Sequence, residues 1–295
     1  MKPRHPTRAA SHPVALLLLA WLFVAPAGRL YAYSLEYQLA VNACSTGVSN
    51  QTLVLSDHLL AQSQLNTDNR PVAVSSDWVK MSVFMDSWAK DHYYPVGSFT
   101  NFLGNSLWMF SPSEFKGFFM DTNRFSTTLS GTVLTDRVNQ LLGLPDTSGN
   151  GYIAEIWVDP TTFFRPSRNP LLTNVTESWT FPDPLIGVPG KTGPEYYTWF
   201  TNRLDTIYSA ATPYPWSSLG YTYDWGTNGH LAGETAYVGL SEFVMFKGAG
   251  TYQYYVDGVY TPSQYVPEPG AAMLVVVGVG WLLLARRRRL PNADH

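Results

Sequence analysis

The segment from Asp146 to Gly151 carries side-chain oxygens at the spacing of a calcium-binding loop. Asp146, Ser148 and Asn150 stand at the first, third and fifth positions of such a loop, and Gly151 stands where the loop turns. The twelfth position, which normally holds a glutamate with two ligand oxygens, is Trp157. The residues therefore predict at most weak calcium binding. A plain Gly/Asn turn between a helix and a strand explains the same letters.

A second feature is the density of aromatic residues between positions 214 and 225. Trp216, Tyr221, Tyr223 and Trp225 are candidate glycan contacts, because exposed indole and phenol rings can stack on sugar rings. Aromatic side chains also bury large areas and usually pack in the core. The sequence is compatible with glycan contact and with core packing, and the composition favours core packing.

No other group of residues nominates a catalytic site. Glu155 and Asp159 would lie roughly 13 Å apart along one side of a strand, too far for the paired carboxylates of a glycosidase, so solvated surface positions are expected. His58 and His92 each follow an aspartate, which is not the spacing of a helical metal site. The single cysteine, Cys44, cannot form an internal disulfide, and a buried thiol is expected. We therefore predict no catalytic residues and no cofactor other than the weak calcium loop.

Two segments have the apolar spacing of helices. The first runs over residues 132–142, with Gly143 at the position of a C-cap glycine. The second runs over residues 195–211, where Thr192 and Glu195 have the spacing of a capping box. Each predicted helix presents one apolar face to a core.

Three segments are rich in strand-forming residues, namely 152–158, 236–246 and 251–256. The glycines in residues 247–250 predict a hairpin between the last two strands, and Asp257-Gly258 predicts a further turn. Residues 160–194 are rich in proline and predict a long irregular connection. The fold class expected is α+β: a single domain, dominated by antiparallel β-structure, with about two amphipathic helices.

Charge is distributed unevenly along the chain. The net charge of the whole chain is −3, but residues 33–266 contain eleven basic and twenty acidic residues and so carry −9. A nucleic-acid partner is not expected, because such binding needs a positive surface.

Residues 1–32 have the pattern of a secretory signal peptide. Three basic residues precede an unbroken apolar run over residues 14–25, which is too short for a comfortable membrane span. Cleavage could follow Ala25-Pro26-Ala27, which has small residues at the right spacing, or Leu30-Tyr31-Ala32, which precedes a more polar stretch. We prefer a mature chain that starts near Tyr33. This pattern predicts an export translocon and a signal peptidase as partners.

The C-terminal residues have three parts in a fixed order. Pro267-Glu268-Pro269 is followed by an uncharged apolar segment, 271–285, and then by Arg286, Arg287, Arg288 and Arg289. The apolar segment would span about 22 Å as a helix, which is short for a hydrocarbon core of about 30 Å. The arginines would stay on the cytoplasmic side, which places residues 33–265 outside the cytoplasm.

Residues 266–290 resemble a PEP-CTERM sorting signal. In that family an exosortase, a multi-spanning membrane enzyme, recognises the signal and processes it, and the host bacteria typically make an extracellular polysaccharide matrix. The resemblance implies a chain that is held briefly in the inner membrane with its C-terminus in the cytoplasm, and then reaches the cell surface or the matrix. An ordinary tail anchor that is never cut is the alternative interpretation.

The resemblance concerns sorting and leaves the role of the central domain open. One hypothesis is a non-catalytic surface or matrix protein. The other is an exported carbohydrate-binding module or glycan-active enzyme of the polysaccharide matrix, for which a cleft with converging aromatic residues and two carboxylates is expected.

Overall fold

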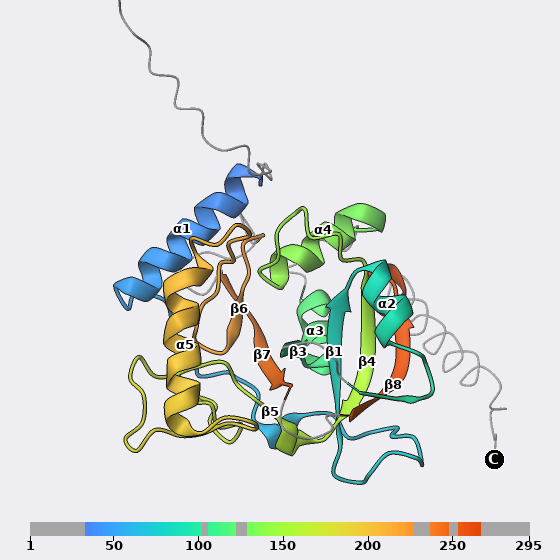
Figure 1. The fold of residues 1–295 in the computed structure, drawn as a ribbon. Coiled ribbons are helices and arrows are strands. Elements are labelled where there is room, and N and C mark those ends of the chain that lie inside the picture. The colour runs from blue at the N-terminus through green and yellow to red at the C-terminus, as the bar shows by residue number, and fades with distance from the viewer. Residues whose placement is uncertain (1–32, 102–105, 122–128, 227–236, 248–252, 267–295) are drawn as a thin grey trace, which may run out of the picture. The chain divides into compact units, whose positions relative to one another are not determined.

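The computed structural model describes residues 33–101, 106–121, 129–226, 237–247 and 253–266. An antiparallel sheet with the order β2-β8-β4-β1-β3-β7-β5 forms the centre of the domain, and β6 pairs with β7 (Figure 1). The strands are β1 (Val79–Met85), β2 (Phe99–Asn101), β3 (Ser106–Phe110), β4 (Tyr152–Val158), β5 (Phe163–Phe164), β6 (Tyr221–Tyr223), β7 (Val238–Phe246) and β8 (Gln253–Tyr260). The helices are α1 (Leu35–Ser49), η1 (Gln62–Gln64), α2 (Ser87–Tyr93), α3 (Pro112–Met120), α4 (Gly131–Leu141), η2 (Pro160–Thr162), α5 (Gly193–Ile207) and α6 (Pro262–Tyr265). The prediction of an α+β fold rich in antiparallel structure is confirmed.

The two predicted helices are present as α4 and α5. Gly143 follows α4 with a φ of +66°, which an L-residue with a side chain adopts only at a cost. Thr192 and Glu195 form the capping box of α5. This helix ends at Ile207, four residues before the predicted end. Pro213 lies close downstream, and the intervening residues form turns.

The predicted hairpin between residues 236–246 and 251–256 is wrong. β7 pairs with β3, β5 and β6, whereas β8 pairs with β4 and β2, so β3, β1 and β4 lie between the two strands. The turn predicted at Asp257-Gly258 is also wrong. The chain continues through both residues as one strand, with a bulge opposite Glu155 and Ile156. Gly258 is compatible with a bulge as well as with a turn. The chain forms the bulge because it pairs with the buried strand β4 on both sides of this point.

Helices other than the two predicted ones are present in the described part of the chain. α1 packs Tyr37, Ala40, Val41 and Cys44 into a cluster with the aromatic residues of β6. α3 inserts Phe115 beside Phe110, and the short helices α2 and α6 cover parts of the sheet near its β8 side. None of the described helices combines the length and the apolar character needed to cross a membrane. The predicted segments 1–32, 271–285 and 286–289 lie outside the described residues.

The register of the strands places the two glutamates of β4 and β7 on the same face of the sheet. Ser82 lies opposite both Phe110 and Glu155, and Phe110 lies opposite Glu242, so all four share this face. Two hydrophobic clusters cover it. One contains residues of α3, α4 and α6 with Phe110, and the other contains residues of α5 with Trp216 and Val244. The face that carries Glu242 therefore has two separate groups of covering side chains.

Candidate functional site

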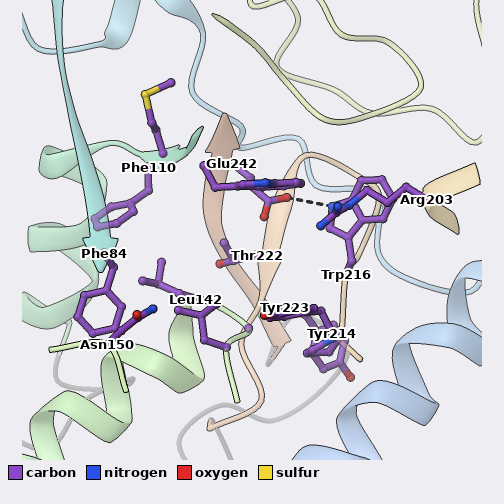
Figure 2. Close-up of a pocket in the computed structure, with 15 residues that line it drawn as sticks. Phe84, Phe110, Leu142, Asn150, Arg203, Tyr214, Trp216, Thr222, Tyr223 and Glu242 are labelled. Atoms are coloured by element: carbon purple, nitrogen blue, oxygen red, sulfur yellow. Dashed lines mark hydrogen bonds between the residues drawn. The ribbon is translucent and has the colours of Figure 1, made fainter. Parts of the chain in front are cut away.

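A cavity of about 280 Å³ lies where these two clusters meet over the sheet (Figure 2). Phe84, Phe110 and Leu142 from the α4 side form one wall. Arg203 and Trp216 from the α5 side form the opposite wall. The volume lies just below the usual range of about 300–1,000 Å³ for small-molecule sites, and an apolar lining with few polar groups is typical of them.

Arg203 supplies the positive charge of the cavity. It lies on α5 one turn after Trp199, and its guanidinium stacks at 4.5 Å from the ring centre of Trp108 and at 5.2 Å from that of Trp216. Its Nε is buried without a hydrogen-bond partner, and no described residue forms a hydrogen bond or ion pair with the guanidinium. The aromatic rings hold the cation in place by cation–π attraction and leave its hydrogen-bond donors unused.

Glu242 supplies the only carboxyl group among the described lining residues. It lies in β7 opposite Phe110, and it accepts a hydrogen bond of 3.2 Å from the indole Nε1 of Trp216. Burial raises the pKa of Glu242 to about 8, although the charge of Arg203 and the Trp216 hydrogen bond act to lower it. The carboxyl group is therefore largely protonated at neutral pH and can donate a hydrogen bond into the cavity.

The turn after α4 shapes the floor of the cavity. A Cβ atom on Gly143 would lie 3.3 Å from the carbonyl oxygen of Tyr223, so glycine is needed here for close approach as well as for its positive φ. Leu142 and Asn150, at the two ends of this turn, both face the cavity in Figure 2.

The four candidate glycan contacts are all buried. Trp216, Tyr221, Tyr223 and Trp225 are between 0 and 9% exposed, and three of them belong to the cluster formed with α1. Tyr221 and Trp225 use their polar atoms on the backbone carbonyls of Val54 and Leu144. The four residues therefore do not form an exposed stacking surface, and only Trp216 and Tyr223 line the cavity.

Two of the three candidate calcium ligands already form hydrogen bonds with residues outside the predicted loop. Asp146 accepts a hydrogen bond of 3.0 Å from the backbone N–H of Ser34, and the Ser148 hydroxyl donates to the Asn139 side chain at 2.6 Å. The described residues contain no cluster of three or more acidic, histidine or cysteine side chains that could hold a metal ion. Calcium binding by Asp146, Ser148 and Asn150 stays a prediction.

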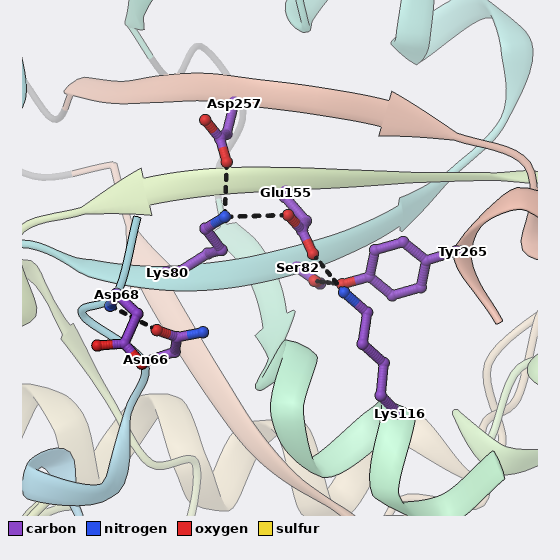
Figure 3. Close-up of polar contacts among 8 residues, drawn as sticks. All are labelled: Asn66, Asp68, Lys80, Ser82, Lys116, Glu155, Asp257 and Tyr265. Atoms are coloured by element: carbon purple, nitrogen blue, oxygen red, sulfur yellow. Dashed lines mark hydrogen bonds and ion pairs between the residues drawn. The ribbon is translucent and has the colours of Figure 1, made fainter. Parts of the chain in front are cut away.

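A second polar cluster lies on the same face of the sheet, nearer β8 (Figure 3). Glu155 accepts hydrogen bonds from Lys80 at 3.2 Å and from Lys116 at 2.9 Å, and Lys80 also donates to Asp257 at 2.6 Å. Burial acts to raise the pKa of Glu155, but the two lysines outweigh it and hold this pKa below its usual value. The expectation of a solvated surface position for Glu155 is therefore wrong, because this carboxylate is 6% exposed and fully paired.

This cluster fastens the end of the described chain to the sheet. The hydroxyl of Tyr265, on α6, lies 2.7 Å from that of Ser82, and Lys116 lies 4.4 Å from the centre of the Tyr265 ring. Because the charged groups already satisfy one another, we interpret the cluster as structural. Asp159, by contrast, caps η2 through the backbone N–H of Thr161.

The remaining candidates have structural surroundings. Cys44 is fully buried, and its thiol donates to the carbonyl of Trp216 at 3.0 Å. Burial raises the pKa of the Cys44 thiol well above its usual value, which makes the reactive thiolate rare. His92 stacks on Trp88 on the surface of α2. The sorting residues Pro267, Glu268, Pro269 and Arg286 to Arg289 lie outside the described residues.

Sequence analysis did not single out Arg203 or Glu242. Two signals were present. Arg203 lies four residues after Trp199, which puts both on one side of a helix, and Glu242 is the one charged residue in an otherwise uncharged strand. Comparisons with protein-family models, with curated proteins and with solved structures give no match for this chain.

Proposed function

We propose that this protein is an exported, non-catalytic binding protein whose cavity takes a small ligand at the cell surface or in the extracellular matrix. Residues 1–32 act as a signal peptide, residues 33–265 form the exported domain, and residues 266–290 act as a sorting signal of the PEP-CTERM type. The translocon, signal peptidase and an exosortase-type enzyme are the partners in this pathway.

Export is supported by agreement between the two terminal segments. The basic and apolar order of residues 1–25 directs the following chain out of the cytoplasm. The arginines at 286–289 favour the cytoplasmic side and place the preceding domain outside. The apolar segment 271–285 is short for a permanent span, which favours transient anchoring and processing.

The binding role is carried by one observation, namely that Arg203 lines a cavity without a polar partner among the described residues. The Arg203 guanidinium forms no hydrogen bond or ion pair with a described residue. A ligand in the cavity with an acceptor group would therefore add a charge-assisted hydrogen bond at this place. Catalysis is less well supported. Glycoside hydrolysis ordinarily uses two carboxyl groups, and Glu242 is the one carboxyl group among the described lining residues.

A carbohydrate-binding role is the second candidate. It is favoured by Trp216 and Tyr223, which line the cavity together with Trp108. The ring faces of Trp108 and Trp216 are in contact with Arg203, which leaves less flat surface for a sugar to stack on.

A cavity-filling variant tests the binding role. Leu142→Trp places a larger side chain into the cavity, and Val133→Trp, at an exposed position of α4, is the matched control. Thermal unfolding of the full-length protein would be followed with a panel of small carboxylic acids, amines and methyl glycosides. We expect at least one compound to raise the unfolding temperature of the wild type and of Val133→Trp but not of Leu142→Trp. The absence of any such compound would contradict the binding role.

A further inference from the structure

The charge balance of the cavity indicates the chemistry of its ligand. Arg203 stays protonated at neutral pH, although burial lowers its pKa. Glu242 lies nearby, but no ion pair within 4.0 Å joins the two side chains. Tyr208 and Tyr214 are the remaining titratable groups near Arg203. Both phenols are neutral at neutral pH, and burial raises the pKa of each further. At neutral pH this end of the cavity therefore holds one positive charge without a counterion among the described residues.

The groups around Glu242 allow it to stay neutral. Arg203 faces it from α5, and the Trp216 indole donates to it from the segment before β6. Cys44 of α1 is a further titratable neighbour, and it stays a neutral thiol. The strand β3 presents no titratable side chain on this side, where Ser106, Trp108 and Phe110 lie. A protonated Glu242 thus adds a second donor beside the guanidinium.

The other end of the cavity carries no charged side chain among the described lining residues. Phe84 and Leu142, with Phe110 beside Glu242, form a largely apolar wall, to which Asn150 adds one amide group (Figure 2). Sugar hydroxyl groups placed against this wall would lose their hydrogen bonds to water, which costs free energy. An apolar body gains by burial in the same place.

We propose that the cavity binds a small monocarboxylic acid with an apolar body, whose carboxylate accepts hydrogen bonds from Arg203 and from the protonated carboxyl group of Glu242. The apolar body lies against Phe84, Phe110 and Leu142. This inference rests on the proposed function, and it adds the class of ligand and a dependence on pH. Above pH 8 Glu242 ionises in the free protein, so binding requires proton uptake and the affinity falls about tenfold for each further pH unit.

Calorimetry with two isosteric probes tests this assignment on the full-length protein. Phenylacetate and phenylacetamide have the same shape and differ in charge. At pH 6 we expect phenylacetate to bind at least tenfold more tightly than the amide, and at pH 9 we expect its affinity to fall about tenfold. Equal binding of the two probes would overturn the ligand class and leave the binding role intact.

Variants separate the two donors. Arg203→Met is expected to lose the preference for phenylacetate, and Arg203→Lys to recover part of it. Lys191→Met, which removes a cation outside the cavity, is expected to bind as the wild type does. Glu242→Gln retains a donor but cannot titrate, so its affinity is expected to be the same at pH 6 and pH 9. A persistent pH dependence in a folded Glu242→Gln protein would overturn the role of Glu242.

The outcomes also distinguish this inference from the function on which it rests. Binding of methyl glucuronoside or methyl glucoside in place of phenylacetate would replace the apolar acid by a sugar. A failure of every probe here, together with a failure of the panel described above, would count against a binding cavity altogether.

Discussion

Buried charged side chains hold together segments that lie far apart in the sequence of this domain. Arg137 of α4 and Asp224, just after β6, form a bidentate pair with two distances of 2.7 Å. The two side chains are 7% and 0% exposed. Such a pair fixes the position of α4 relative to β6, and hence one boundary of the cavity.

Removal of one member of this pair is expected to destabilise the domain strongly. Asp224→Asn removes the carboxylate that the buried Arg137 guanidinium binds through two hydrogen bonds, and we expect a loss of about 3–5 kcal/mol in the free energy of unfolding. Urea unfolding monitored by circular dichroism measures this. The double variant Arg137→Met with Asp224→Leu is the control, and it should cost less than Asp224→Asn alone. A single-variant cost below about 1 kcal/mol would show that the pair does not stabilise the fold.

Because three buried glutamates have raised pKa values, we expect the free energy of unfolding to fall as pH rises through neutrality. Burial raises the pKa of Glu114 to about 7 and the pKa values of Glu177 and Glu242 to about 8. The folded domain then binds more protons than the unfolded chain between the ordinary glutamate pKa and pH 8. The stability that these groups contribute is complete below the ordinary pKa and is lost as pH rises, by about 1.4 kcal/mol per pH unit for each such group.

The measurement is the free energy of unfolding at pH 5, 6, 7 and 8. We expect it to fall across this range, and Glu242→Gln should make the fall shallower. Glu155 acts in the opposite direction, because its lowered pKa makes stability decline below the ordinary glutamate pKa. Stability that rises from pH 5 to pH 8 would show that these carboxyl groups ionise freely in the folded domain.

At the scale of single elements, the helix α4 and its glycine cap position the floor of the cavity. Gly143 and Gly149 both have positive φ, at +66° and +70°. An added Cβ would meet the Tyr223 carbonyl at position 143 and would meet no atom within 4 Å at position 149.

This pair of glycines offers a matched comparison. Gly149→Ala should cost roughly 1–2 kcal/mol through backbone conformation alone. Gly143→Ala should cost more, because the adjacent segment with Tyr223 must also move, and it should weaken ligand binding. Thermal unfolding and calorimetry measure the two effects. Equal costs for the two variants, with unchanged binding, would contradict the role given to Gly143.

The elements also show which structural features local sequence could predict. α4, α5 and β4 were predicted because each has strong periodicity or a run of strand formers with clear end signals. α1 was missed, although Tyr37, Ala40, Val41, Cys44 and Val48 recur at helical spacing, because alanine and cysteine mark a buried face weakly. The pairing of β7 and β8 was missed because neighbouring strands often form hairpins, and only distant partners decide otherwise.

The candidate site is formed by residues that lie far apart in the sequence, so their contacts could not be predicted from local spacing. Arg203 and Glu242 are 39 positions apart, and Trp108 comes from a third segment of the chain. Their meeting follows from the order of β3 and β7 in the sheet and from the packing of α5 beside them. The aromatic residues between positions 214 and 225 lie in the core, as composition favoured. Their presence in the sequence did not indicate which polar groups face the cavity.

In the whole molecule, a domain with a ligand cavity lies between two terminal segments to which we assign its export in our proposal. Residues 33–266 carry a net charge of −9, which favours the solubility of the domain. The cluster of Lys80, Glu155 and Tyr265 fastens the domain just before the Pro-Glu-Pro segment, so few residues separate the folded part from the apolar segment 271–285.

Native mass spectrometry of the protein recovered outside the producing cells tests this account most directly. We predict a chain that starts near Tyr33, lacks Arg286 to Arg289 and carries a small molecule that is released on unfolding. The Leu142→Trp protein should have the same termini and no bound molecule. A chain that stays inside the cell, or one that keeps the arginine cluster in its final form, would contradict the account.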